Sequence, residues 1–358
     1  MTLPRWRSVA TRVDLLRSTG ARHAWRRWQR DRALRRVEAV RRAGVARELW
    51  GEAAAELGAT VTELAPGRLE VRRGDATTML RGQHTGLNTP EALALANDKP
   101  AAYAALDRAG GAVPEHLALE ASDLGPARAF VARGPVPCVV KPAVGSGGDG
   151  VTGGVRTTAE LRRAALSASR FAQRLLVERQ VAGEVFRLLV LDGEVLDVVR
   201  RLPPQVEGDG ASNVEELMFA EYDRRLRANG DGGLKPFAVD LDCLLTLASE
   251  GLSLRSVPGR GTRVRVKTVS NYNRRVENEV VGDGASPELK AQALAAAEAL
   301  GLRLAGVDVV TSSAAESGTV VDVNATPGLH HHAYVANGSS AARVAVPILR
   351  RLLEEAAR

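Results

Sequence analysis

Two short apolar runs near the end of the sequence each contain a carboxylate, and they limit the folds that the chain can adopt. Residues 305–310 hold Asp308 among alanine, glycine and valine, and residues 320–324 hold Asp322 and Asn324 before a Thr-Pro-Gly turn. Apolar runs rich in valine that end at a Pro-Gly turn are typical of strands. Burying a carboxylate in a strand is costly unless a partner neutralises its charge. We therefore expect a cation beside these strands.

A metal ion is the cation that this set of side chains suits. Asp322 and Asn324 stand two residues apart, so their side chains share one face of a strand. With Asp308 they offer only oxygen donors, which a hard ion such as Mg²⁺ prefers. The alternative interpretation is that both aspartates are capping or turn residues at strand ends.

Length and composition indicate a globular chain with more than one subdomain. The sequence has 358 residues, of which 45% are hydrophobic and 25% charged. It contains no apolar run of about 18 residues that could span a bilayer. The N-terminus lacks the apolar region and cleavage site of a secretory signal. Cys138 and Cys243 lie in unrelated contexts, which argues against a disulfide framework or a zinc site. We expect a cytoplasmic protein without a membrane partner.

The net charge of +7 is concentrated near the N-terminus. Residues 5–47 carry an arginine every few positions, against only three acidic residues, Asp14, Asp31 and Glu38. Apolar residues recur among them at roughly helical spacing, which predicts one or two amphipathic helices. Their basic face is either an ordinary solvated surface or a docking surface for an acidic partner.

The remaining pattern alternates helices with strands. Further helices are expected at residues 97–109, 158–171, 214–227, 287–300 and 341–357. Strands are expected at 61–64, 69–71 and 175–178, on both sides of a glycine loop within 136–155, and in a hairpin over 186–199 that turns at Asp192-Gly193. Hairpins are as common as crossovers, which favours an α+β fold.

The glycine loop over residues 139–151 is the second feature that indicates chemistry. Gly145, Gly147 and Gly150 satisfy the G-x-G-x-x-G pattern, but a strand-like segment follows instead of the helix that a dinucleotide site requires. No Gly-Lys-Ser/Thr closes the loop, which excludes a P-loop. The pattern favours a hairpin flap that lays backbone N–H groups over phosphates, with Lys141 on the entering strand.

These motifs, in this order, resemble the ATP-grasp superfamily of carboxylate–amine ligases. The likeness is closest to the ATP-grasp domains of cyanophycin synthetase and bifunctional glutathione synthetase, and D-alanine–D-alanine ligase is more distant. It covers residues 88–340 and depends on Asn97-Asp98-Lys99, Val140-Lys141-Pro142, Leu176-Val177-Glu178, Gly183-Glu184, Arg187-Leu188-Leu189-Val190, Arg201-Leu202-Pro203-Pro204, Val206-Glu207-Gly208-Asp209-Gly210 and the segment from Asp322 to Gly328.

The resemblance implies the domain organisation. It predicts an ATP-grasp fold, in which two α+β subdomains clamp ATP, preceded by a smaller, partly helical N-terminal domain. The corresponding boundaries are 1–90 for the N-terminal domain, 91–182 for the small subdomain with the flap, and 183–358 for the C-terminal subdomain with the metal site.

The resemblance also implies roles for individual residues. The expected contacts to ATP come from Lys99, Lys141, Gly145, Ser146, Gly147, Gly148, Gly150, the hinge from Glu178 to Val181, and Glu184 at the ribose. Asp308, Asp322 and Asn324 would hold two Mg²⁺ ions, with Mn²⁺ as an alternative, although the family usually has glutamate at the position of Asp322. Arg187, with Arg200 or Arg201, would face the transferred phosphoryl group.

The implied reaction joins a small-molecule carboxylate to an amine through an acyl phosphate, with release of ADP and phosphate. An ATP-grasp kinase that forms no amide is the alternative, and a non-enzymatic basic adaptor is a third hypothesis. The family further implies a homodimer.

Two segments lie near the expected substrate. One differs from the resembled family, and the other has three interpretations. The loop at 271–275 is bulky and cationic where the resembled enzymes keep small residues, so we predict that Arg274 or Arg275 binds an acidic or carboxylate-rich substrate. The histidines 330–332 are an exposed polar loop, a substrate contact or a metal site.

Overall fold

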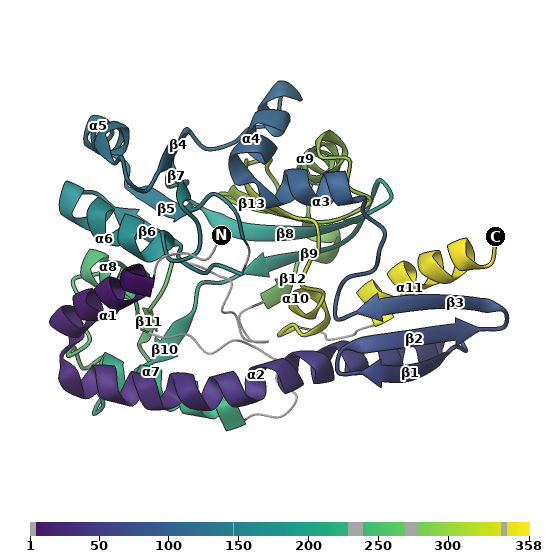
Figure 1. Cartoon of the computed structure of the whole chain (residues 1–358), viewed down its shortest axis with the longest axis horizontal. Helices are drawn as coiled ribbons and strands as arrows, with labels where there is room; N and C mark the ends of the chain where they lie inside the picture. Colours follow the sequence, from purple (N-terminus) through teal and green to yellow (C-terminus); the bar gives the residue numbers. More distant parts are fainter. Residues whose placement is uncertain (1–4, 146, 228–238, 269–277, 338–341) are drawn as a thin grey trace.

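Two antiparallel sheets dominate the protein (Figure 1). The computed structural model describes residues 5–145, 147–227, 239–268, 278–337 and 342–358. Helices and strands mix along the chain, and the predicted α+β class is confirmed.

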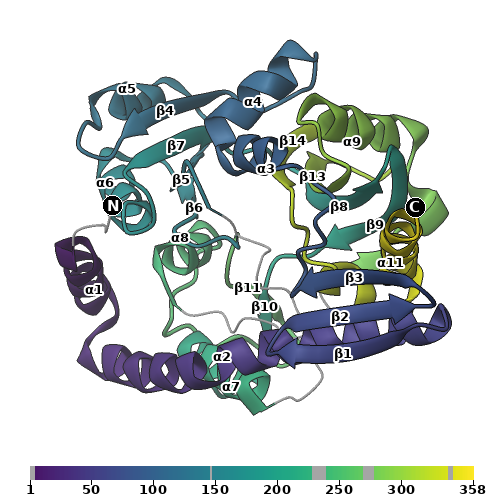
Figure 2. The same cartoon turned by 45° about the vertical axis from the view of Figure 1, so that its right-hand side comes forward.

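The N-terminal part combines two helices with a three-stranded sheet. These elements are α1 (Arg5–Thr19), α2 (Ala21–Glu56), β1 (Thr60–Ala65), β2 (Arg68–Arg73) and β3 (Ala76–Arg81). The helices and the first two strands were expected, whereas β3 was not. Figure 2 shows α2 running from α1 to the three-stranded sheet.

The smaller main sheet carries the glycine flap. Its strands, in the order β4-β7-β5-β6, are β4 (His116–Glu120), β5 (Cys138–Pro142), β6 (Thr152–Val155) and β7 (Arg174–Arg179). Two helices pack on it, α5 (Gly125–Arg133) and α6 (Thr158–Ala168). Thr157 and Glu160 form a capping box that fixes the start of α6. The predicted strand, loop and strand over 136–155 are confirmed as β5, the flap and β6.

The larger main sheet has the order β12-β9-β8-β13-β14. Its strands are β8 (Glu184–Leu191), β9 (Glu194–Arg201), β12 (Asn278–Val280), β13 (Leu304–Thr311) and β14 (Thr319–Asn324). Helices α3 (Pro90–Asn97), α4 (Lys99–Arg108) and α9 (Pro287–Ala299) contribute to the core on one face, and α10 (His330–Ala333) and α11 (Ala342–Ala356) to the core on the other. The predicted hairpin is confirmed: Asp192 turns between β8 and β9 with φ 47°.

The alternation of side chains along β8 places charge on one face of this sheet. Phe186, Leu188 and Val190 belong to the core that contains α9, whereas Leu189 and Leu191 belong to the core with α2 and α11. Arg187 therefore shares the face of Leu189. It pairs in register with Asp308 of the neighbouring strand β13. Arg187 and Asp308 therefore lie on the same face of the sheet as Leu189 and Leu191, which form the apolar part of that face.

A third, smaller core holds the segment between β9 and β12. It contains β10 (Gln205–Glu207), β11 (Arg263–Arg265), α7 (Val214–Arg227) and α8 (Leu241–Ser249). Only α7 was predicted, with the same bounds. The two three-residue strands are too short for a period-2 pattern to show in the sequence.

The N-terminal helices contact several distant parts of the chain. Asp14 of α1 accepts two hydrogen bonds of 3.0 Å from Arg163 of α6. His23 of α2 bonds Glu215 of α7 at 2.7 Å, and Trp50 lies in one apolar cluster with residues of α11. The boundaries at residues 90 and 182 stay predictions.

Two expectations from the sequence concern membrane-spanning helices and the cysteines. In the part of the chain that the structure describes, no helix is long and apolar enough to cross a membrane. Cys138 and Cys243 are both buried, and no disulfide joins them.

Candidate active site

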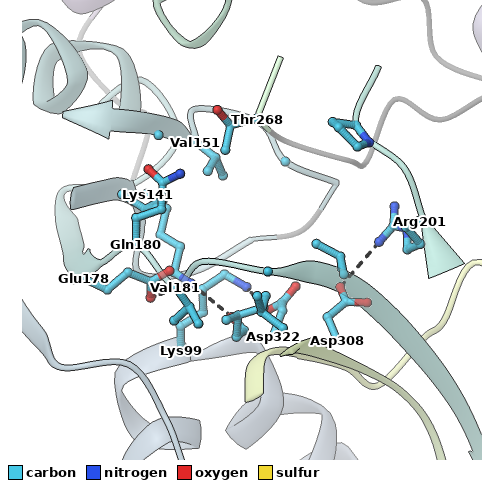
Figure 3. A pocket seen from close by; sticks show the side chains of 18 of the residues that line it. Lys99, Lys141, Val151, Glu178, Gln180, Val181, Arg201, Thr268, Asp308 and Asp322 are labelled. Carbon is cyan, nitrogen blue, oxygen red and sulfur yellow. Dashed lines mark hydrogen bonds and ion pairs between the residues drawn. The ribbon is translucent and has the colours of Figure 1, made fainter. Parts of the chain in front are cut away.

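A cavity of about 580 Å³ lies between the two main sheets, beside the connection 180–183 that joins β7 to β8 (Figure 3). Its lining combines apolar side chains, including Val139, Leu202 and Val310, with lysines, arginines and carboxylates. Such a lining suits a ligand that has an apolar ring and several negative charges.

Most of the residues predicted for the site line this cavity. They are Lys99, Lys141, Gly145, Gly147, Gly148, Glu178, Val181, Glu184, Arg201, Asp308 and Asp322. Three predicted residues stand behind the lining: Arg187 contacts Asp308, Asn324 contacts Asp322, and Gly150 packs at the base of the flap. A Cβ at Gly150 would lie 2.7 Å from the Phe171 ring, so this glycine permits close packing rather than covering the cavity. Ser146, Arg274 and Arg275 lie outside the described residues.

The two strand carboxylates lie side by side and are neutralised by cations. Asp308 and Asp322 pair directly across β13 and β14. Asp308 accepts hydrogen bonds of 2.7 and 2.6 Å from Arg187, and Arg201 lies 3.5 Å away. Asp322 accepts a bond of 2.5 Å from Lys99. The interpretation as strand-end caps is wrong, because both aspartates lie within their strands.

The donor set predicted for a metal ion consists of Asp308, Asp322 and Asn324. The Asn324 amide nitrogen donates to Asp322 at 3.2 Å. Among the described residues, no group of three His, Cys, Asp or Glu side chains is arranged to hold a metal. An ion here would therefore depend on these two carboxylates, one amide oxygen and the ligand itself, as is usual for Mg²⁺ at phosphates.

The surrounding charges change the acidity of these groups. Burial works to raise the pKa of Asp322, but the positive charges of Lys99 and Lys141 outweigh it and lower the pKa to about 2. Burial and the nearby charge of Arg187 lower the pKa of Arg201 to about 9. The fold therefore buries Arg201 beside another positive charge, although burial and repulsion both destabilise its charged form. Such an arrangement is typical of groups used for binding or catalysis.

Lys141 is held by a buried network that was not predicted, although Lys141 and Glu178 were each expected at the site. Its ammonium lies 2.8 Å from Glu178 and donates to the Tyr103 hydroxyl at 3.0 Å. The hydroxyl is 2.6 Å from the Val321 carbonyl and 3.0 Å from Glu178, and it has one proton to donate. The carbonyl contact is the shorter, so we assign the proton to it. Burial and the Glu178 charge raise the pKa of Tyr103 well above its ordinary value.

The two arginines between which the sequence could not choose have separate surroundings. Arg200 donates to Glu184 at 2.9 Å and also pairs with Glu279. Arg201 is 2% exposed and lies beside Asp308 in the cavity. Of the two arginines, Arg201 is therefore the one that lines the cavity.

The three adjacent histidines form the short helix α10, not an exposed loop. His331 and His332 are buried, so that interpretation is wrong for both. His332 bonds Asp197 at 2.8 Å, which ties α10 to β9, and His330 bonds Gln83 at 3.0 Å. Burial lowers the pKa of His331 well below its ordinary value. Contact with a substrate stays a prediction.

Sequence reasoning missed Tyr103 and Asp242. Tyr103 stands four residues after Lys99 on α4, and this spacing places the two side chains on one helix face. That spacing was a usable signal. Asp242 lies in α8, a helix that was not predicted although Asp240 at its N-cap was a usable signal, and it is 1% exposed.

Comparisons with known proteins agree with this geometry. Residues 98–186 match a family described as the ATP binding domain of the carbamoyl-phosphate synthase L chain. Cyanophycin synthetase of a Nostoc species is 32% identical over 251 residues, which is 68% of this chain and 28% of that protein. The bifunctional glutathione biosynthesis protein of Mannheimia succiniciproducens is 29% identical over 261 residues, 70% of this chain and 34% of that protein. The chain thus spans about a third of these relatives.

One solved structure shows the same fold. The bifunctional glutathione synthetase of Pasteurella multocida superposes with a TM-score of 0.51 at 24% identity, and the match covers 83% of this chain and 42% of that one.

Proposed function

The ATP-grasp fold and the relationship to cyanophycin and glutathione synthetases that the sequence indicated are confirmed, and on that basis we propose that this chain is an ATP-dependent, ADP-forming carboxylate–amine ligase. The observation that carries the proposal is the cavity in which Lys99, Lys141, Arg201 and two strand carboxylates converge beneath a glycine flap.

ATP fits this cavity by the chemistry of its lining. Lys99 and Lys141 would bind phosphates, the hinge from Glu178 to Val181 would receive adenine, and Glu184 would bind the ribose. The carboxylates of Asp308 and Asp322 and the amide oxygen of Asn324 are hard donors, and we propose that they hold two Mg²⁺ ions. When bound, Mg²⁺ would neutralise phosphate charge and polarise the phosphoryl oxygens.

The proposed reaction needs positioning rather than a protein nucleophile. A substrate carboxylate oxygen attacks the γ-phosphorus, the bond to the β-phosphate oxygen breaks, and ADP leaves. The amine nitrogen then attacks the carbonyl carbon of the acyl phosphate, loses a proton, and expels phosphate to leave an amide. Arg201 lies at the cavity beside Asp308, where it would stabilise the charge of the transferred group.

Phosphate release distinguishes the ligase from the kinase alternative. We would incubate the protein with ATP, Mg²⁺ and pooled carboxylates, with and without pooled amines. A ligase releases phosphate in proportion to an amide product that mass spectrometry detects. A stable phosphorylated product whose formation never depends on an amine would establish the kinase instead.

Replacing Tyr103 with phenylalanine tests the network behind Lys141. The ammonium would lose one hydrogen-bond partner while it keeps Glu178 and Val321. We expect KM for ATP to rise about fivefold with a smaller change in kcat, because the loss of one hydrogen bond to a charged group misplaces a binding residue. Tyr222 of α7 is also buried, and Tyr222→Phe is the matched control. Equal KM values in the two variants would contradict the assignment.

The finer predictions about partners belong to this proposal. We propose an acidic carboxylate substrate recognised through Arg274 or Arg275, a homodimeric assembly, a cytoplasmic location, and an acidic partner for the basic N-terminal helices. Mass-spectrometric screening of amino-acid pairs for a condensation product tests the substrate class directly.

A further inference from the structure

A buried carboxylate outside the cavity lining joins the glycine flap to the opposite wall. Asp242 stands in the first turn of α8 and is 1% exposed. One of its oxygens accepts the backbone N–H of Gly153 at 2.9 Å, and the other accepts the backbone N–H of Thr268 at 3.1 Å. Gly153 and Thr268 both line the cavity.

Within the described residues, no sheet joins the two segments that carry these backbone groups. Gly153 lies on β6, the strand by which the flap returns to the small sheet, and β6 is the edge strand of that sheet. Thr268 follows β11, which pairs with β10 in a separate ladder. The Asp242 side chain therefore connects the smaller main sheet to the segment that follows the β10–β11 pair.

Close packing accompanies these hydrogen bonds. A Cβ at Gly153 would lie 3.0 Å from the Thr268 methyl group, so the glycine lets the two segments meet. Gly154 adds a second attachment, since its N–H donates to the Gln180 side chain at 2.8 Å. The return strand of the flap is thus fixed to the opposite wall and to the connection that leads from β7 to β8.

Neighbouring groups stabilise the negative charge of Asp242. The Lys267 ammonium lies 3.6 Å from it and donates to both oxygens of Asp240 at 2.6 Å. Hydrogen bonds from N–H groups to an ionised carboxylate are stronger than neutral ones. An amide at position 242 would turn an NH₂ group toward one of the two N–H donors and leave that donor without an acceptor.

We propose that Asp242 is a positioning residue that fixes the return strand of the glycine flap against residues 263–268 and so sets the flap over bound nucleotide. The proposal rests on the nucleotide site proposed above. Asp242 itself does not touch the nucleotide; it acts through the backbone of Gly153 and Thr268.

Hydrogen exchange of the nucleotide-free protein tests the attachment without assuming any activity. In Asp242→Asn we expect peptides covering residues 143–155 to exchange about tenfold faster than in the unsubstituted protein. Asp240→Asn is the matched control, because Asp240 shares Lys267 and caps α8 but has no bond to the flap. In that variant we expect faster exchange in α8 and unchanged exchange in the flap.

Binding of the ATP analogue AMP-PNP with Mg²⁺, measured by calorimetry, supplies the second readout. We expect Kd to rise about tenfold in Asp242→Asn and less than about twofold in Asp240→Asn. If Asp242→Asn does not fold, Gly153→Ala is the alternative variant. Its added methyl group would press against Thr268 and separate the same two segments, and we expect hydrogen exchange in the flap to become faster by a similar factor.

The outcomes separate the two proposals. Unchanged flap exchange and unchanged Kd in Asp242→Asn would overturn the positioning role. Failure of the unsubstituted protein to bind AMP-PNP would overturn the nucleotide site, whereas the exchange comparison would still decide whether Asp242 holds the flap.

Discussion

Asp322→Asn is expected to lower ADP formation about a thousandfold while the protein stays folded, because the variant loses one of the two carboxylates proposed to hold Mg²⁺, the ion that would neutralise phosphate charge. Asp322 is ionised at neutral pH, since the lysines around it lower its pKa to about 2. Asparagine keeps the shape and one oxygen donor. Coupled-enzyme measurement of ADP, with circular dichroism as a folding check, tests the prediction.

Asp192→Asn is the matched control for this experiment. Asp192 also pairs with basic side chains, Arg303 and Arg351, but it lies at the hairpin turn between β8 and β9, and it is not part of the cavity lining. We expect ADP formation close to that of the unsubstituted protein. Normal turnover in Asp322→Asn would remove this residue from the proposed metal site.

Asp308→Ala is expected to destabilise the protein by about 3–5 kcal/mol, because it leaves two guanidinium groups buried without their shared carboxylate. Asp308, Arg187 and Arg201 are 5%, 3% and 2% exposed. Urea unfolding should show a lower midpoint with an unchanged m value.

The double variant Asp308→Leu/Arg187→Met shows whether Asp308→Ala loses stability because a buried charge is left unpaired or because a packing contact is lost. Replacing both members of a buried ion pair with apolar groups of similar volume is often nearly neutral. We expect it to recover part of the lost stability while it remains inactive in ADP formation. An Asp308→Ala variant as stable as the unsubstituted protein would show that the arginines do not depend on this carboxylate.

Local patterns made several residues of the cavity predictable. Asp308 and Asp322 stood out because an acidic residue in a valine-rich strand needs a partner, and the flap stood out because three glycines followed a Lys-Pro strand. The hairpin at Asp192 was readable from one Asp-Gly pair. Each of these signals lies within a few residues.

The partners of those groups were not predictable, because folding chooses them from distant parts of the chain. Lys99 reaches Asp322 across 223 residues, and Asp242 reaches Gly153 across 89. The sequence predicted a metal ion as the neutralising charge, whereas the fold also supplies Arg187, Arg201 and Lys99. The short strands β10, β11 and β12 and the helix α10 form through such tertiary contacts, which override weak local preferences.

The apolar cluster that joins α2 and the three-stranded sheet to α11 has a consequence for folding during synthesis. Trp50 and Leu69 leave the ribosome long before Ile348 and Leu349, which are buried in the same cluster. Until α11 is made, the apolar face of the early segment lacks this part of its cover, and closing the contact involves most of the chain length. We expect the final step of folding to be slow and nascent chains to depend on chaperones, because exposed apolar surface favours aggregation.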